Sequence, residues 1–194
     1  MTQSIDFPEL YILRHGETVW NAENRMQGAL NSPLTEKGRA QAARQGALLA
    51  EMDLTGFAVL CSPQGRAFET AAIAVAPRLP LIRTDDRLRE IEVGAWQGKI
   101  RDELQVHVPV VDGPDGPLAL YEHAPGGEGF AALEVRCRAF LKDLIGPAVL
   151  VTHGMTSRML RCLWLGLDRD ALGQMPGGQG NIFHMKDGMQ NEIV

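Results

Sequence analysis

The chain has 194 residues, 45% of them hydrophobic, which is enough to bury the core of a single domain spanning residues 1–194. Its formal net charge of −5 argues against nucleic acid or an anionic membrane as a partner, so any anionic ligand needs a local basic pocket. No secretory signal or membrane-spanning apolar run is visible, and the three scattered cysteines suit a reducing cytosol, which predicts a soluble, cytoplasmic protein.

Short apolar runs alternate with helical patterns along the chain. Strands are expected at residues 10–13, 57–61, 80–84, 148–152, 181–185 and 191–194. Helices are expected from Glu36 onward, over residues 66–76 and 130–144, and from Gly154 to about Leu165. This βαβα order predicts a three-layer α/β/α sandwich with a mostly parallel central sheet.

Two segments carry more specific expectations. The helix that begins at Glu36 should bury the face on which apolar residues recur at spacings of three and four. That face consists of Ala40, Ala43, Ala47 and Ala50. Residues 99–125, by contrast, are irregular and include a double turn, DGPDGP, at 112–117. We expect this segment to form a short lid over the functional site.

Basic and reactive residues follow three of the expected strands. Arg14 and His15 end the first strand in LRHG, Arg66 follows the second in CSPQGRA, and His153 follows a later one in THG. In open α/β sheets, ligands bind beyond the carboxyl ends of the strands. We therefore expect the two histidines and the two arginines to meet at one edge of the sheet. The histidines without such a position, interpreted as structural, are His107, His123 and His184.

Several chemistries use paired histidines, and the neighbouring residues distinguish them. A metal site needs a third ligand, and the arginine beside His15 would repel a cation. A serine nucleophile needs a G-x-S-x-G elbow, and nucleotide binding a P-loop or G-x-G-x-x-G, none of which occurs. Arginines beside histidines suit a phosphoryl group, because guanidinium groups neutralise its oxygens while a neutral imidazole attacks phosphorus. The leaving oxygen then needs a proton, for which Glu90 is the candidate.

Six motifs occur in an order that matches the signatures of one protein family. ILRHGETVWNAENRMQG is similar to the family's opening signature, and SPLTEKGRAQA to its continuation. SPQGRAFETA resembles its second arginine motif, LREIEVGAWQG its acid-bearing motif, PGGE a later loop motif and VTHG its second-histidine motif. RHGE alone is a weak signal, but the ordered set runs from about Tyr11 to beyond His153. On these motifs the chain resembles the histidine phosphatase superfamily, in its phosphoglycerate-mutase-like branch.

The resemblance implies a role for each matching residue. His15 would be the phosphorylated nucleophile, and Arg14, Arg66 and His153 would enclose the phosphoryl group. Glu90 would protonate the leaving group in the first step and activate water in the second. Neither a metal nor an organic cofactor is implied. The other residues carried over are Asn21, which would hydrogen-bond the phosphoryl group, and Glu17, Gln27 and Gly28, which would line or support the pocket.

Some positions depart from the usual pattern of the family without removing a catalytic group. Gln64 and Gly65 precede Arg66 where an apolar residue is frequent, and Glu69 stands where glutamine is common. Met155 follows the second histidine where a small residue is frequent. The pocket wall beside Met155 is therefore expected to differ in shape.

Phosphatases and bisphosphoglycerate-dependent mutases of this family share the catalytic set. The resemblance favours a phosphatase, because Gln27 stands where mutases carry threonine or serine, and because the lid lacks their basic insertion. Residues 99–124 contain Lys99 and Arg101 against five acidic residues. We therefore predict hydrolysis of a small phosphomonoester through a phosphohistidine. The alternatives are a phosphoglycerate mutase and, with less support, an inactive binding module; the particular substrate and the oligomeric state, including a homodimer, stay open.

Overall fold

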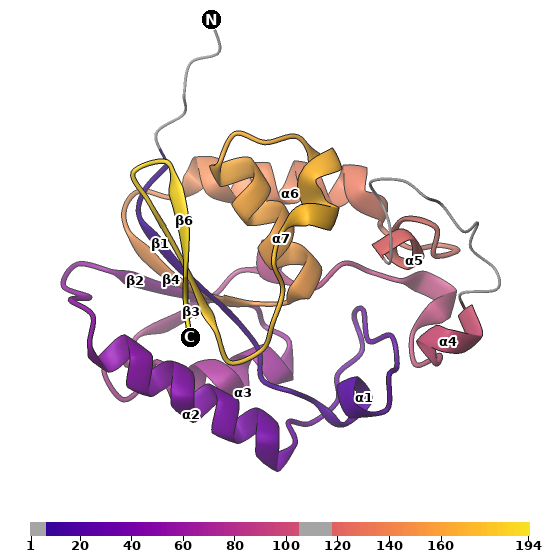
Figure 1. The fold of residues 1–194 in the computed structure, drawn as a ribbon, viewed down its shortest axis with the longest axis horizontal. Coiled ribbons are helices and arrows are strands. Elements are labelled where there is room, and N and C mark those ends of the chain that lie inside the picture. The colour runs from indigo at the N-terminus through magenta and orange to yellow at the C-terminus, as the bar shows by residue number, and fades with distance from the viewer. Residues whose placement is uncertain (1–6, 105–117) are drawn as a thin grey trace, which may run out of the picture.

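A six-stranded sheet forms the centre of the computed structural model, which describes residues 7–104 and 118–194 (Figure 1). The strands pair in the order β3-β2-β4-β1-β5-β6. The first four of this order run parallel, whereas β5 is antiparallel to β1, and β6 to β5. The prediction of a mostly parallel sheet is confirmed. The strands are β1 Leu10–Arg14, β2 Ala58–Cys61, β3 Ile82–Thr84, β4 Ala148–Thr152, β5 Ile182–Lys186 and β6 Met189–Ile193.

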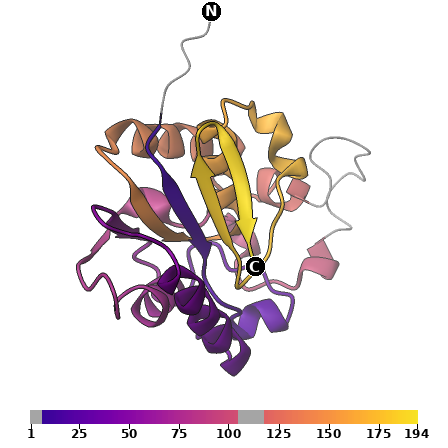
Figure 2. The same ribbon diagram turned by 60° about the vertical axis from the view of Figure 1, so that its left-hand side comes forward.

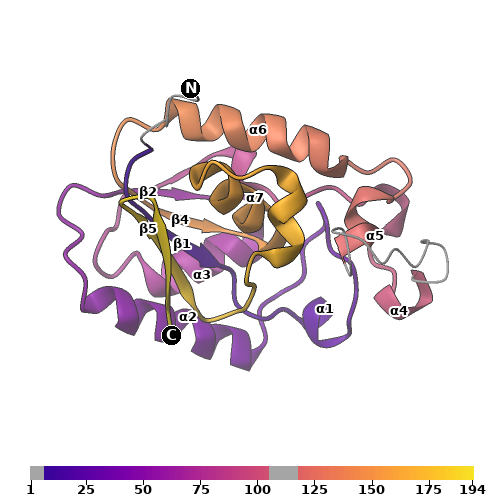
Figure 3. The same cartoon turned by 45° about the horizontal axis from the view of Figure 1, so that its top comes forward.

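Helices cover both faces of this sheet, as the three-layer prediction requires. Figures 2 and 3 show α2 (Glu36–Ala50) and α3 (Gly65–Ala74) on one face, and α6 (Gly129–Asp143) and α7 (Gly154–Trp164) on the other. Three short helices lie beyond the strand ends toward which β1 and β4 point in Figure 3. These are α1 Val19–Ala22, α4 Arg101–Leu104 and α5 Ala119–Glu122, and the 3-10 helices are Asp86–Leu88, Gly94–Trp96 and Arg169–Gln174.

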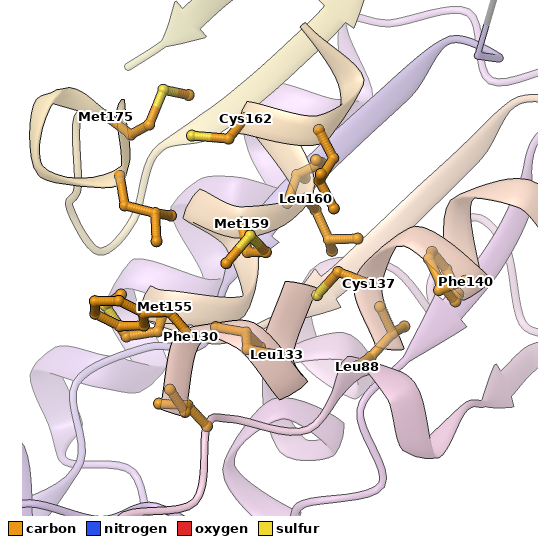
Figure 4. Packing of buried hydrophobic residues seen from close by; sticks show 14 of the residues in the cluster. Leu88, Phe130, Leu133, Cys137, Phe140, Met155, Met159, Leu160, Cys162 and Met175 are labelled. Atoms are coloured by element: carbon orange, nitrogen blue, oxygen red, sulfur yellow. The ribbon is translucent and has the colours of Figure 1, made fainter. Parts of the chain in front are cut away.

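The central strands divide their side chains between two hydrophobic cores. Leu10 and Ile12 of β1 pack into the core beneath α6 and α7, whereas Tyr11 and Leu13 pack into the core beneath α2 and α3. The residues of β4 alternate in the same way, because successive side chains of a strand point to opposite faces. Figure 4 shows part of the first core, in which side chains of α6 such as Leu133 and those of α7 meet. Because helices cover both faces of the sheet, the sequences of its central strands are nearly continuous runs of apolar residues.

The prediction of which face of α2 is buried is wrong. The alanines of the expected stripe, Ala40, Ala43, Ala47 and Ala50, are exposed. The buried residues are Gly38, Ala42, Gln45 and Leu49. Both sets recur at spacings of three and four, so the period alone does not select between them. Gln45 is on the buried face because its amide donates to the carbonyls of Arg14 and Asn181, a demand that hydrophobicity does not reveal.

The expected lid, residues 99–125, is described only at its two ends. Arg101–Leu104 form α4 and Ala119–Glu122 form α5, and the side chain of Arg101 donates to the hydroxyl of Tyr121. The double turn expected at 112–117 lies outside the described residues, as does His107. Within the described ranges, no helix has the length and apolar character needed to cross a membrane.

The first turn of α2 packs directly against the loop that follows β1. Thr35 caps the helix by accepting a hydrogen bond from the Gly38 N–H at 3.0 Å, and its own N–H donates to the Glu17 carbonyl at 2.9 Å. A Cβ atom on Gly38 would lie 2.0 Å from the oxygen of Glu17, and one on Gly16 would lie 2.2 Å from the oxygen of Gly38. Only glycine lets these two backbones approach so closely.

This contact predicts that Gly38→Ala destabilises the protein. A helical Gly→Ala change ordinarily stabilises by roughly 0.5–1 kcal/mol. Here the added methyl would overlap backbone atoms, so we expect the free energy of unfolding to fall by about 1–3 kcal/mol in urea titrations. The control is Ala43→Gly on the exposed face, which should cost about 1 kcal/mol through helix propensity alone. A Gly38→Ala variant as stable as the wild type would contradict the prediction.

Candidate active site

The candidate site lies where β1, β2 and β4 end. Strand pairing places Arg14 opposite Thr152, and the N–H of His15 donates to the Thr152 carbonyl at 3.0 Å. On the other side of β4, the N–H of Ser62 donates to the Val151 carbonyl at 2.9 Å. The next residue after β4 is His153, whose ring centroid is 5.1 Å from that of His15. The parallel register thus brings both histidines to the same edge.

His15 is held as a neutral imidazole with one nitrogen free to react. Its Nδ1 lies 2.7 Å from the Gly16 carbonyl oxygen, and since a carbonyl only accepts, Nδ1 carries the proton. The lone pair is then on Nε2. Burial, followed by the positive charges of Arg66 and Arg14, holds the pKa of His15 well below its usual range. The ring therefore stays unprotonated at neutral pH, which a nucleophile requires.

His153 is fully buried beside it. Its Nε2 forms a 2.7 Å hydrogen bond with the hydroxyl of Ser62, which in turn accepts the N–H of Gln64. Its Nδ1 is buried and has no partner among residues 7–104 and 118–194. Burial, Arg66 and His15 lower the pKa of His153 well below its usual range. Ser62 therefore orients the ring and leaves Nδ1 as a polar atom in the site.

Arg66 is buried and held by a loop rather than by an acid. Its Nη1 donates to the Leu30 carbonyl at 2.7 Å and its Nη2 to the Gly28 carbonyl at 3.0 Å. Gly28 adopts a φ of +55°, and a Cβ there would meet Val93, so glycine suits this turn. Burial lowers the pKa of Arg66 to about 10, an effect that the charge of Glu90 partly offsets. The guanidinium remains charged, and its Nε is buried without a partner in the described part of the chain.

Arg14 approaches the same point from the end of β1. Its guanidinium packs over Gly154, where a Cβ would be only 3.4 Å from Cζ. Its Nε, like that of Arg66, is buried with no hydrogen-bond partner among the residues described. Unpartnered buried polar groups are rare and need an explanation. Two guanidinium Nε donors and the free Nδ1 of His153 around a neutral imidazole form a site suited to an anion with several oxygens.

Glu90 reaches the site from the segment after the Asp86–Leu88 helix and caps α7. Its Oε1 accepts the N–H groups of Ile91, Met155 and Thr156 at 3.1–3.2 Å. Among the residues described, its Oε2 accepts only the Met155 N–H, at 3.2 Å. Glu90 therefore satisfies the first amides of α7 in place of an N-cap side chain, since His153 provides no such bond. Oε2 is the oxygen with capacity left to carry a proton.

Asn21 is oriented so that its amide nitrogen is available. Its Oδ1 accepts the Thr18 N–H at 3.2 Å and the side-chain amide of Gln179 at 3.1 Å. Because both partners are donors, Oδ1 is the oxygen and Nδ2 points elsewhere. Gln179 comes from the glycine-rich loop before β5, so the end of the chain contributes to the position of this residue.

Gln27 and Glu17, two further residues predicted from the sequence, make different contacts in the structure. Gln27 is buried beside Gly28, and its Oε1 has no partner among the residues described. The carboxylate of Glu17 instead binds Lys37, at 2.8 Å, and Thr35, so it ties the loop to α2. The Lys37 hydrogen bond lowers the pKa of Glu17.

Met155 does not wall the pocket as its position after the second histidine suggested. Its side chain is buried in the core beneath α6 and α7, near Phe130 in Figure 4. What it presents to the site is its backbone N–H, which Glu90 accepts. Substitution of this side chain therefore acts on packing rather than on the shape of the pocket wall.

Sequence reasoning did not identify four residues that contact or approach the site. Ser62 could have been found, because it follows β2 at the same edge as the two histidines. Gln64 and Gln179 lie in loops whose conformations no periodicity reveals. Tyr121 of α5 lies near the guanidinium groups of Arg14 and Arg66.

The remaining histidines lie away from this site or outside the described residues. His184 stacks on Tyr11 with ring centroids 4.3 Å apart and binds the carboxylate of Glu9 at 2.6 Å. His123 is exposed at the end of α5. Among the residues described, no three His, Cys, Asp or Glu side chains are grouped so that they could hold a metal ion.

Comparison with known proteins identifies the class to which this fold and site belong. The model of the histidine phosphatase superfamily (branch 1) matches residues 10–188. The chain therefore belongs to this superfamily of enzymes, whose members related to it include proteins named as phosphatases and as mutases. Membership implies that the substrate is a phosphorylated small molecule.

Three relatives illustrate the range of similarity. "Probable phosphoglycerate mutase GpmB" of Erwinia tasmaniensis is 32% identical over 173 residues, which cover 84% of this chain and 77% of that protein. The structure of Bacillus stearothermophilus YhfR is 37% identical, with a TM-score of 0.75 and coverage of 95% and 94%. A mycobacterial glucosyl-3-phosphoglycerate phosphatase, solved with VO3, is 29% identical, with a TM-score of 0.76 and coverage of 91% and 92%.

The buried neutral histidines predict how stability depends on pH. Because the folded pKa values of His15 and His153 lie below 6.5, the unfolded chain binds more protons below that pH. The contribution of these histidines to the free energy of unfolding should therefore be fully present above about pH 6.5. As the pH falls below that value, the free energy of unfolding should decrease by at most about 1.4 kcal/mol per pH unit for each histidine. In urea titrations from pH 7.5 to 5, His15→Asn should show a shallower fall than the wild type. Parallel curves for the two proteins would contradict the assignment.

Proposed function

We propose that the protein is a phosphomonoesterase that works through a phosphohistidine on His15. The observation that carries the proposal is the state of that ring: Nδ1 is fixed as a donor to Gly16, and Nε2 is the unprotonated nitrogen. Around it lie three buried polar nitrogens without partners among the described residues. A neutral nucleophile inside a set of anion-binding groups is what transfer of a phosphoryl group requires.

In the first step, Nε2 of His15 attacks phosphorus and the bond from phosphorus to the substrate oxygen breaks. Arg14, Arg66 and Asn21 bind the phosphoryl oxygens, and the Nδ1 side of His153 faces the same group. The leaving oxygen takes a proton from Oε2 of Glu90, so the alcohol departs neutral. The products are the free alcohol, phosphohistidine and a Glu90 carboxylate.

In the second step, the same residues act in reverse. The Glu90 carboxylate removes a proton from water as the water oxygen attacks phosphorus, and the N–P bond breaks. The electron pair returns to Nε2 of His15, inorganic phosphate leaves and Glu90 is again protonated. The hydrogen bonds from the first turn of α7 hold the carboxylate in place through both steps.

The comparisons support the chemistry without identifying the substrate. The mycobacterial relative is named as a phosphatase and was solved with VO3, an oxyanion of vanadium. The residues that would hold such an anion here are Arg14, Arg66 and His153. This similarity makes vanadate a suitable probe of the proposed site.

The roles of His15 and Glu90 predict different dependences on the leaving group. His15→Ala should abolish turnover of glycerol phosphate and of p-nitrophenyl phosphate, since no covalent route remains. Glu90→Gln should slow the first step of the alkyl ester by about 10²–10⁴-fold, because its alkoxide needs a proton. The nitrophenolate leaves as a stable anion, so its first step should change far less, and phosphorylated His15 should accumulate because water is not activated.

Rapid-quench kinetics with detection of acid-labile protein phosphate measures both steps. The assays contain EDTA, because arginines rather than a metal are proposed to neutralise the phosphate. Equal losses for the alkyl and aryl first steps would remove Glu90 from the acid role. Turnover that persists in His15→Ala would remove His15 as the nucleophile.

A phosphoglycerate mutase is the second candidate, because relatives at 32–34% identity carry that name. Two features of this chain disfavour it. Gln27 stands where mutases of the family carry threonine or serine, and residues 99–124 hold Lys99 and Arg101 against five acidic residues. This composition does not favour recognition of a second anionic group on the substrate. A mutase must also retain its phosphorylated state against water.

We therefore expect negligible mutase activity beside hydrolysis. The measurement compares phosphate release with interconversion of 2- and 3-phosphoglycerate, with and without 2,3-bisphosphoglycerate, by NMR. Hydrolysis should dominate, and the bisphosphate should not stimulate exchange. Efficient interconversion that depends on the bisphosphate would favour the mutase instead.

A further inference from the structure

Gln64 lies in the turn between β2 and α3, next to the candidate site. The residue is buried, with a relative exposure of 6%. It is the N-cap residue of α3, yet its side chain does not cap that helix. A buried amide needs partners for both its donor and its acceptor, and here the helix supplies neither.

The partners come instead from two segments of the site. The Nε2 of Gln64 donates to the Gly28 carbonyl at 2.9 Å, and its Oε1 accepts the N–H of Glu90 at 2.8 Å. The orientation of the amide is unambiguous, because a carbonyl only accepts and a backbone N–H only donates. One side chain thus joins the backbone of Glu90 to the turn at Gly28.

That turn also positions the phosphate-binding arginine. The Gly28 carbonyl accepts Nη2 of Arg66 as well as Nε2 of Gln64, so a single oxygen receives both side chains. The N–H of Gln64 donates to Ser62, the residue that orients His153. Gln64 therefore bonds directly to the backbone of Glu90, and it is linked to the guanidinium of Arg66 through the Gly28 carbonyl and to His153 through Ser62.

We propose that Gln64 is a positioning residue that holds Glu90 at the distance from the phosphoryl site at which its proton reaches the leaving oxygen. This rests on the proposed phosphatase function. Positioning matters because displacement of a reacting group by about 1 Å costs on the order of 10²-fold in rate. The carboxylate of Glu90 is bound to α7, but its backbone N–H needs Gln64 to keep the segment in register with the Gly28 turn.

Loss of Gln64 should affect the acid more than the phosphate pocket. The N–H of Glu90 would be left buried without an acceptor, so its segment would move toward water. Arg66 would keep its bonds to Gly28 and Leu30, so the phosphoryl group would still be bound. The expected signature is a fall in kcat for substrates that need a proton, with little change in KM.

The test uses Gln64→Met, which nearly preserves volume and removes both hydrogen bonds. We expect kcat for glycerol phosphate to fall by about 10- to 100-fold while KM changes less than about twofold. The burst of nitrophenol from p-nitrophenyl phosphate should keep its rate, since that step does not need the acid. Hydrogen exchange of the Glu90 amide, followed by NMR, should become faster than in the wild type. If the methionine variant does not fold, Gln64→Asn, too short to reach both partners, receives the same measurements.

Gln190→Met is the matched control. The amide oxygen of Gln190, on β6, accepts a hydrogen bond from Nη1 of the buried Arg161, on α7, at 2.9 Å. Neither residue belongs to the proposed catalytic set. The Gln190→Met variant should lower the free energy of unfolding without changing the ratio of the first-step rates of glycerol phosphate and p-nitrophenyl phosphate. Equal losses in the first-step rates of both esters in Gln64→Met, or unchanged exchange at Glu90, would overturn the positioning role alone. A wild type that hydrolyses neither ester would overturn the phosphatase proposal, and this inference with it.

Discussion

Parallel pairing of β1 with β4 determines the distance between the two histidines, and the other groups of the site are arranged around that pair. The hydrogen bond from His15 to Thr152 continues the strand ladder by one residue, so each histidine leaves its strand at the same level. The turn after β2 joins the same ladder through Ser62. Reactive groups carried on neighbouring parallel strands are more precisely held than groups carried on separate loops.

Burying the like charges of Arg14 and Arg66 beside these rings opposes folding, and hydrogen bonds to backbone carbonyls partly compensate for it. Within the described ranges, Arg66 is held by the Gly28 and Leu30 carbonyls and not by a carboxylate in direct contact. An ion pair there would neutralise the charge that a phosphate needs. Carbonyl groups hold the guanidinium and leave it positive. The pocket is therefore built for an anion that comes from outside, and binding of such an anion would also stabilise the folded protein.

The sequence was sufficient to predict the strands, the layers and the edge at which the histidines and arginines lie. These features depend on local periodicity and on the fixed direction of parallel strands. The buried face of α2 was mispredicted because Gln45 is selected by backbone carbonyls that lie far away in the sequence. The bonds of Gln64 and Gln179 were not predictable for a related reason. They join loops whose relative positions exist only after the whole sheet has formed.

The order of the strands has a consequence for how the protein is made. β1 is synthesised first and lies at the centre of the sheet, yet its two neighbours, β4 and β5, begin at Ala148 and Ile182. A growing chain therefore carries β1 with both edges unpaired through most of its synthesis, and such edges favour aggregation. Non-local pairing of this kind also slows folding. His15, next to β1, acquires its buried surroundings only after β4 and β5 have emerged.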